Sequence, residues 1–155
     1  MIQANGERRI TGSHQKKNES QVYEDVWRDI PYSIDYNRDR LIISNITPVT
    51  AYMIEKTCFD RVPPFDESLF VYEDFVMALE LSLHYPFYHL PEPLSWFTWR
   101  EDGTSMSSTR DFTSPLKKIY EKFFPYAQDQ VWVATNINAI LQARGLQPMF
   151  QIVQE

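Results

Sequence analysis

The chain has 155 residues, the length of one ordinary domain, with a net charge of −6, 43% apolar and 15% aromatic residues. Its four glycines are scattered, which excludes the clustered glycines of a dinucleotide-binding G-x-G-x-x-G motif, a P-loop or a G-x-S-x-G elbow. The acidic balance argues against a general nucleic-acid binder. A single cysteine excludes an internal disulfide framework and a multi-cysteine zinc site.

The hydropathy of the chain indicates a protein that does not enter a membrane. No stretch of about 20 apolar residues is present, so we expect no transmembrane segment. The first 18 residues are polar and lack the apolar region of a signal peptide. Together with the lone cysteine, these features predict a cytoplasmic protein.

The N-terminal third has weak periodicity. Residues 1–40 form a polar segment, in which residues 12–20 predict a loop and residues 22–30 have apolar positions at helical spacing. The apolar run 41–46 is rich in β-branched residues and predicts a strand entering the core. Residues 48–58 predict a short helix.

The rest of the chain has clearer signals for where helices end. Apolar residues recur every four positions from 72 to 85, which predicts a helix ended by Pro86. Gly145 is expected to stop the last helix. The remaining predicted elements are strands at 87–90 and 94–99, helices at 114–127 and 129–144, and a small closing strand at 149–153.

Several short motifs follow one another after a predicted strand that ends at Asn45. They are Phe65-Asp66-Glu67-Ser68-Leu69, Glu73-Asp74, Leu90-Pro91-Glu92-Pro93-Leu94, and Trp99-Arg100 followed by Ser105 and Ser107. Each motif alone is weak, but their order and spacing resemble the C-terminal, acceptor-side half of inverting family 2 glycosyltransferases with the GT-A fold.

The resemblance implies a fold and three regions. The fold would be α/β, a partial GT-A-like, Rossmann-like half with a mixed sheet, flanking helices and a C-terminal helical hairpin. Residues 1–40 would be a polar N-terminal segment, residues 41–110 the acceptor-side core, and residues 111–155 a C-terminal helical extension.

The resemblance also implies a reaction, the transfer of a sugar from a nucleotide-sugar donor to a glycan or lipid-linked acceptor. Such a displacement needs a base for the attacking hydroxyl, and a carboxylate within hydrogen-bond reach suits that role. By resemblance Asp74 is that base, and Glu73 supports its orientation or acceptor binding. The alternative is that both carboxylates only stabilise the first turn of a helix.

Four further residues are candidate substrate-binding residues: Asn45, Trp99, Arg100 and Ser105. A guanidinium at Arg100 suits a diphosphate because it binds two oxygens at once, although pairing with a nearby carboxylate is an equal alternative. Asn45 either lines the sugar pocket or bonds backbone in a turn. Tyr72 and Trp99 are among the aromatic residues that could stack on a sugar, although most aromatic residues must be core.

The donor-binding half of the family has no counterpart in this sequence. A divalent cation, Mg²⁺ or Mn²⁺, is expected from the resemblance, but its Asp-x-Asp ligand motif is absent. Asp102 could ligate a hard cation, yet an Asp before glycine more often starts a turn. We therefore expect this chain alone to be inactive without an N-terminal donor-binding half.

Two other functions stay open. The chain could be a non-catalytic interaction module that docks a protein partner through its C-terminal helices, with Trp132, Ile137 and Leu141 as candidate contacts. It could also be an unrelated α+β domain in which the motif order is chance.

Other reactive residue types have more ordinary interpretations. His84 and His89 flank apolar residues and are expected at the rim of the core. Cys58 lacks a paired histidine signature and is not expected to be a nucleophile. Asp66 is expected to order its own loop.

Overall fold

The computed structural model describes residues 2–4, 11–17, 23–29, 35–46, 48–62, 65–90, 96–100 and 109–152. Four of its strands, β1, β2, β3 and β6, are described by their backbone. The strands are β1 (Ile2–Ala4), β2 (Thr11–Lys17), β3 (Tyr23–Asp29), β4 (Tyr52–Ile54), β5 (Phe87–Tyr88) and β6 (Trp96–Arg100). The α-helices are α1 (Arg38–Ile43), α2 (Glu73–His84), α4 (Ser114–Phe123) and α5 (Gln130–Ala143), with 3₁₀ turns at Val49–Ala51, Lys56–Asp60 and Phe124–Tyr126.

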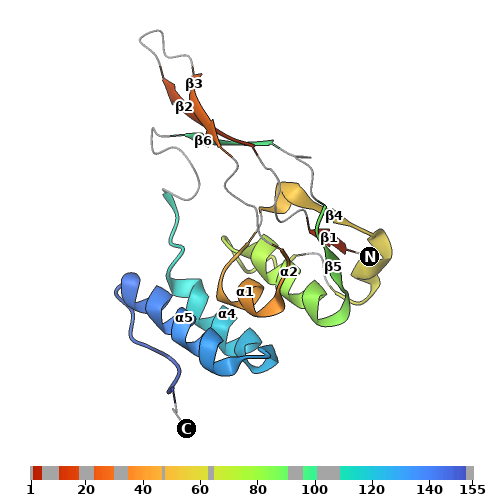
Figure 1. Cartoon of the computed structure of the whole chain (residues 1–155), viewed down its shortest axis with the longest axis vertical. Helices are drawn as coiled ribbons and strands as arrows, with labels where there is room; N and C mark the ends of the chain where they lie inside the picture. Colours follow the sequence, from red (N-terminus) through yellow and green to blue (C-terminus); the bar gives the residue numbers. More distant parts are fainter. Residues whose placement is uncertain are drawn as a thin grey trace.

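The four α-helices of the described residues form the body of the molecule and enclose its hydrophobic core (Figure 1). Helix α1 is central, since it contacts α2, α4 and α5. Its side chains Leu41 and Ile42 are almost completely buried. Helices α2 and α5 contribute Phe75 and Ile137 to the same core. The described residues thus form a mixed α and β fold in which helices predominate.

Two small mixed sheets accompany the helices within the described residues. In the first, β1 pairs antiparallel with β4 and parallel with β5, so that Ile2 lies opposite both Ile54 and Phe87. In the second, β2 pairs antiparallel with β3 and parallel with β6. This second sheet projects away from the helical body (Figure 1).

The clearest predicted helices are confirmed. Helix α2 covers residues 73–84, and α4 with its 3₁₀ extension and α5 cover the two C-terminal predictions. Asp129 caps α5 by accepting a hydrogen bond from the Trp132 N–H at 2.9 Å. Gly145 has a φ of 73°, a conformation that glycine adopts without strain, and it ends α5 as predicted.

Three predictions in the N-terminal third are wrong. The predicted loop at 12–20 overlaps β2, and the apolar spacing at 22–30 belongs to the strand β3. The predicted strand at 41–46 begins as helix α1, because the Asn37 side chain caps the helix by accepting from the Arg40 N–H. A continuous apolar run cannot distinguish a buried strand from a buried helix.

Two other predictions need correction. Residues 48–58 form two 3₁₀ turns around β4 rather than one helix. Residues 149–152 do not form a strand. Instead, the Asn138 side chain of α5 accepts from the N–H groups of Met149 and Phe150 and donates to the Phe150 carbonyl. Three hydrogen bonds from one buried amide thus replace the pairing of a strand.

A buried carboxylate joins α1 to the start of α5. Asp39 is only 6% exposed, and its two oxygens accept from the N–H groups of Gln128 and Asp129, each at 2.8 Å. The Tyr120 hydroxyl of α4 donates to the Ile43 carbonyl at the end of α1, at 2.9 Å. The buried Asp39 carboxylate and the Tyr120 hydroxyl are therefore hydrogen-bonded, as a stable core requires, whereas the Nε of Arg38 in α1 is buried without a partner among the described residues.

None of the helices within the described residues is long and apolar enough to cross a membrane.

Candidate functional site

The Asp74 carboxylate lies in the first turn of α2 and is half-buried. One of its oxygens, Oδ1, accepts from the Phe75 N–H at 2.7 Å. The other, Oδ2, faces the Asn45 amide nitrogen at 3.4 Å, a contact between residues 29 positions apart. That distance is longer than a typical hydrogen bond, so Oδ2 is only weakly held.

The surroundings of Asp74 favour its protonated form. Burial raises the pKa of the Asp74 carboxyl, and the neighbouring charge of Glu73 raises it further. The hydrogen bonds from Phe75 and Asn45 oppose that rise without cancelling it. A carboxylate with a raised pKa is a stronger base, and this is the change that general-base catalysis near neutral pH requires.

Two buried polar atoms near Asp74 lack hydrogen-bond partners among the described residues. One is the hydroxyl of Tyr52 in β4, whose pKa is raised by burial first and by the charge of Asp74 second. The other is Oδ1 of Asn45. Buried polar atoms are rarely left unpaired in proteins, and each such atom calls for an explanation such as a bound ligand or water.

A cavity of about 280 Å³ lies next to this group. Asn45 lines it, so the Asn45 side chain links the cavity to Asp74. The residues around it come from α2, α4, α5 and the C-terminal end of α1: Ile43, Ser44, Asn45, Tyr72, Phe75, Leu116, Tyr120, Ile140 and Arg144.

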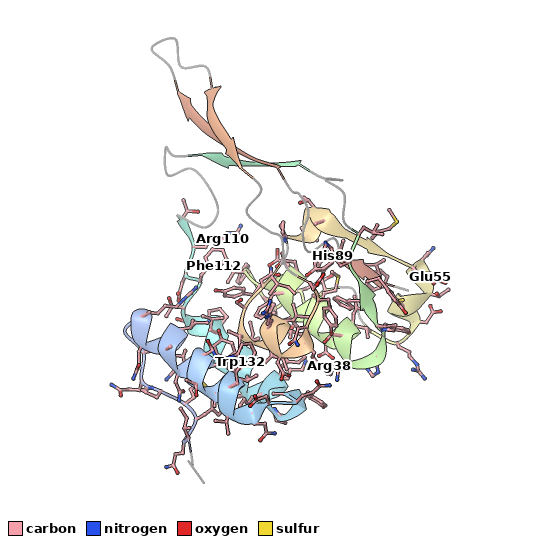
Figure 2. All side chains as sticks on the ribbon, in the orientation of Figure 1. Arg38, Glu55, His89, Arg110, Phe112 and Trp132 are labelled. Carbon is pink, nitrogen blue, oxygen red and sulfur yellow. The ribbon has the colours of Figure 1, made fainter. Side chains whose placement is uncertain are left out.

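Tyr72, immediately before α2, has a strained backbone. Its φ of 66° and ψ of 13° are left-handed, and a non-glycine residue adopts that conformation only at a cost in free energy. The side chain holds it in place, because its hydroxyl donates to the Phe112 carbonyl at 2.9 Å and accepts from Arg144 at 3.2 Å. Figure 2 shows Phe112 on the segment that leads into α4. Such strain is concentrated at functional sites.

The structure brings three of the predicted site residues together and does not describe the side chains of the others. Asn45, Glu73 and Asp74 meet where the segment after α1 passes the start of α2. Trp99 and Arg100 are in β6, where their backbones pair with His14 and Gln15 of β2. Ser105 and Asp102 lie outside the described residues.

Three of the residues with ordinary interpretations lie as expected, whereas His84, expected at the rim of the core, is exposed at the end of α2. Asp66 accepts from both the N–H and the hydroxyl of Ser68, and these bonds lower the pKa of its carboxyl. Cys58 is 2% exposed and packs in the core. The His89 ring, largely buried, bonds Asp35 at 2.8 Å. These residues therefore have structural roles.

The residues that the structure describes do not fit a divalent cation. Among them, no three His, Cys, Asp or Glu side chains converge as metal ligands would. Glu73 and Asp74 supply only two neighbouring carboxylates. We therefore derive no step of the reaction through a metal ion.

Comparison with known proteins adds no family. No protein-family model matches the chain, and neither the curated proteins nor the solved structures include a match. The residues and their geometry therefore carry the functional conclusions below.

Two residues of the site, Tyr52 and Arg144, were not predicted. Tyr52 stands in a segment with no motif, and its neighbour in space, Asp74, is 22 positions away. Arg144 follows the last helix, where a cation is normally explained by the helix dipole. No signal in the sequence separates these residues from structural ones.

Proposed function

We propose that this chain is the acceptor-side part of an inverting glycosyltransferase in which Asp74 is the general base. The observation that carries the proposal is the Asp74 carboxylate, half-buried and with a raised pKa, whose Oδ2 has only a weak side-chain contact, to Asn45, within the part of the chain that the structure describes. Asp39 makes a useful contrast, because both of its oxygens are already bonded to backbone N–H groups.

In the proposed reaction, an acceptor hydroxyl donates a hydrogen bond to Oδ2 of Asp74. As the hydroxyl oxygen attacks the anomeric carbon of the donor, its proton passes to Asp74 and the bond from that carbon to the nucleoside diphosphate breaks. The bonding electrons leave with the diphosphate, and the configuration at the anomeric carbon inverts. Asn45 and Glu73 orient the base: Asn45 through its amide, Glu73 through its charge.

The proposed fold for this reaction is the acceptor-side half of a GT-A domain. The mixed pairing in both small sheets and the helices α4 and α5 at the C-terminus are compatible with that fold. Donor binding is assigned to a separate N-terminal half. The order of motifs from residue 65 to residue 100 supports this assignment.

A turnover assay tests the proposal. The natural gene product is incubated with a panel of nucleotide sugars, Mg²⁺ or Mn²⁺ and candidate acceptors, and released nucleoside diphosphate is measured. Asp74→Asn keeps the shape of the side chain but cannot take the proton, so we expect a loss of about 10²–10⁴ in rate. Asp66→Asn is the matched control and should retain activity within a few-fold. Equal turnover by wild type and Asp74→Asn would refute the role of Asp74.

A second candidate is an interaction module, favoured by apolar exposure on α5. Val131 is 55% exposed and Trp132 is 40% exposed. Ile137 and Leu141 are fully buried, so the expectation that they contact a partner is wrong. Two results together would favour this candidate: the protein shows no turnover, and it binds a partner protein that the Trp132→Ala variant no longer binds.

A further inference from the structure

The cavity beside Asp74 has both polar and apolar lining residues. Asn45 contributes an amide side chain. Arg144 contributes an exposed guanidinium. Small-molecule sites commonly combine apolar walls with a few polar groups that fix the orientation of the ligand.

The Arg144 guanidinium has N–H groups that no described residue accepts from. Its Nη1 donates to the Phe112 carbonyl at 2.7 Å and to the Tyr72 hydroxyl at 3.2 Å. No carboxylate among the described residues pairs with it, and its Nη2 and Nε make no hydrogen bond there. The guanidinium is therefore fixed in place by Nη1 and retains three N–H groups for a ligand.

The field of Arg144 reaches into the cavity. Burial raises the pKa of both the Tyr72 and the Tyr120 hydroxyls, and the positive charge of Arg144 opposes the rise in each case. The charges of Asp74 and Asp111 act on Tyr72 in the opposite sense. The cavity thus has one cation, with anionic groups nearby that limit how much negative charge a ligand can carry.

The walls between these polar groups suit the carbon skeleton of a sugar. The apolar wall residues are Ile43, Phe75, Leu116 and Ile140, and the aromatic ring of Tyr72 joins them. At about 280 Å³ the cavity is near the lower end of the size range of small-molecule sites, roughly 300–1,000 Å³. It therefore has room for a single small group rather than an extended chain.

We propose that this cavity binds a sugar acid, a hydroxylated carboxylate, as the terminal residue of the acceptor. The carboxylate lies against the free N–H groups of Arg144, and a hydroxyl faces the Asn45 side chain. This assignment rests on the proposed function, because it places the bound residue beside the base Asp74.

A singly charged carboxylate fits better than a phosphate. A guanidinium binds the two oxygens of a carboxylate through two parallel hydrogen bonds. A phosphate dianion would carry a second negative charge towards Asp74 and Asp111, with no second cation among the residues that line the cavity. The ligand class follows from this charge balance.

Binding of three probes to the full chain tests the assignment. Methyl glucuronide, methyl glucoside and acetate are titrated against ¹⁵N-labelled protein by NMR. We expect the glucuronide to bind at least about tenfold more tightly than the glucoside, because only the glucuronide has the carboxylate, and more tightly than acetate, because acetate lacks the hydroxyls and ring.

Two arginine variants locate the site. Arg144→Gln should weaken glucuronide binding about tenfold. Arg110→Gln is the matched control, since Arg110 bonds the Phe70 carbonyl and lines a different cavity, and it should leave the affinity unchanged. The amide spectrum of each variant shows whether it is folded, and Arg144→Lys, which keeps the charge, should bind with intermediate affinity.

The possible failures are distinguishable. Equal affinity for glucuronide and glucoside, equal affinity for acetate and glucuronide, or an unchanged affinity in Arg144→Gln would overturn the sugar-acid assignment. Turnover on neutral acceptors alone would overturn it too, while leaving Asp74 as the base. Glucuronide binding that depends on Arg144 in a protein without turnover would refute the proposed transferase and keep the sugar-acid site.

Discussion

Asp39 lies in the first turn of α1, and Asp74 lies beside Asn45, just beyond the other end of the same helix. The two carboxylates differ in how they are used. Asp39 accepts two backbone hydrogen bonds at 2.8 Å, whereas the contact of Asp74 Oδ2 with a side chain of the described residues is the 3.4 Å one to Asn45. One carboxylate is therefore committed to the fold, and the other remains available.

Other buried polar groups also differ in their bonding. The Tyr120 hydroxyl donates to the Ile43 carbonyl, and the Asn138 amide bonds Met149 and Phe150. Near Asp74, Asn45 Oδ1 and the Tyr52 hydroxyl are buried without a partner among the described residues, as is the Nε of Arg38 on α1. An unpaired buried polar group costs about 1–3 kcal/mol, so Asn45 Oδ1 and the Tyr52 hydroxyl lower the stability of the fold.

The largest expected effect is at Asp39. Asp39→Ala removes two hydrogen bonds to a charged carboxylate that is itself buried, so the free energy of unfolding should fall by about 3 kcal/mol. Urea denaturation followed by circular dichroism measures this. Asp60→Ala, at an exposed position, is the control. A loss under about 1 kcal/mol for Asp39→Ala would remove the distinction between the two carboxylates.

Two tyrosine variants should change the free energy of unfolding by a smaller amount, and they should differ from each other. Tyr120→Phe deletes a hydroxyl that donates to the Ile43 carbonyl and should cost about 1 kcal/mol. Tyr52→Phe deletes a hydroxyl with no described partner, so stability should stay constant or rise. The two variants are compared by urea denaturation under identical conditions. A loss in Tyr52→Phe as large as in Tyr120→Phe would show that the Tyr52 hydroxyl is bonded in solution.

The smallest expected effect depends on pH. The pKa of Asp74 is raised above its ordinary value of 3.8 in the folded protein, so the folded state resists its ionisation. Asp74→Asn should therefore be more stable than wild type at pH 7, and this gain should vanish as the pH falls below 3.8. Urea midpoints across the acid range measure the change.

The Asp66→Asn variant should change stability at pH 7 in the opposite direction. Its pKa is lowered in the folded state by the bonds from Ser68. The ionised Asp66 carboxylate therefore stabilises the fold above its ordinary pKa of 3.8, and this contribution is lost as the pH falls through the folded value. Asp66→Asn should show a loss at pH 7 where Asp74→Asn shows a gain. The same sign for both would contradict the contrast in their surroundings.

The helices with clear start and stop signals were predictable from the sequence. Helix α2 has Phe75 and Leu79 at helical spacing and a proline two residues after its end, and α5 begins at the cap Asp129 and ends before Gly145. Such signals are local, so they identify a helix without information on what it packs against.

The elements that depend on distant partners were not predictable. Helix α1 contacts three other helices and buries Leu41, Ile42 and Ile43 in succession, so this apolar run shows no helical period. Strand β2 reads Thr-Gly-Ser-His-Gln-Lys-Lys, without alternation, and is a strand through its pairing with β3 and β6. Strand formation depends strongly on such context.

The candidate site was partly predictable. The motif order selected Asn45, Glu73 and Asp74, which the fold places together. Tyr52 and Arg144 reach the same region from segments that carry no motif, through the chain path alone. Residues that come together only in the folded structure have no characteristic spacing in the sequence.

The central position of α1 also affects how the protein is made. Its hydrogen-bond partners Tyr120, Gln128 and Asp129 come 77 to 90 residues later in the chain. A ribosome adds about 5–20 residues per second, so α1 waits several seconds for the segments that cover it. During that interval its apolar side chains are exposed in the nascent chain, where a chaperone can bind them.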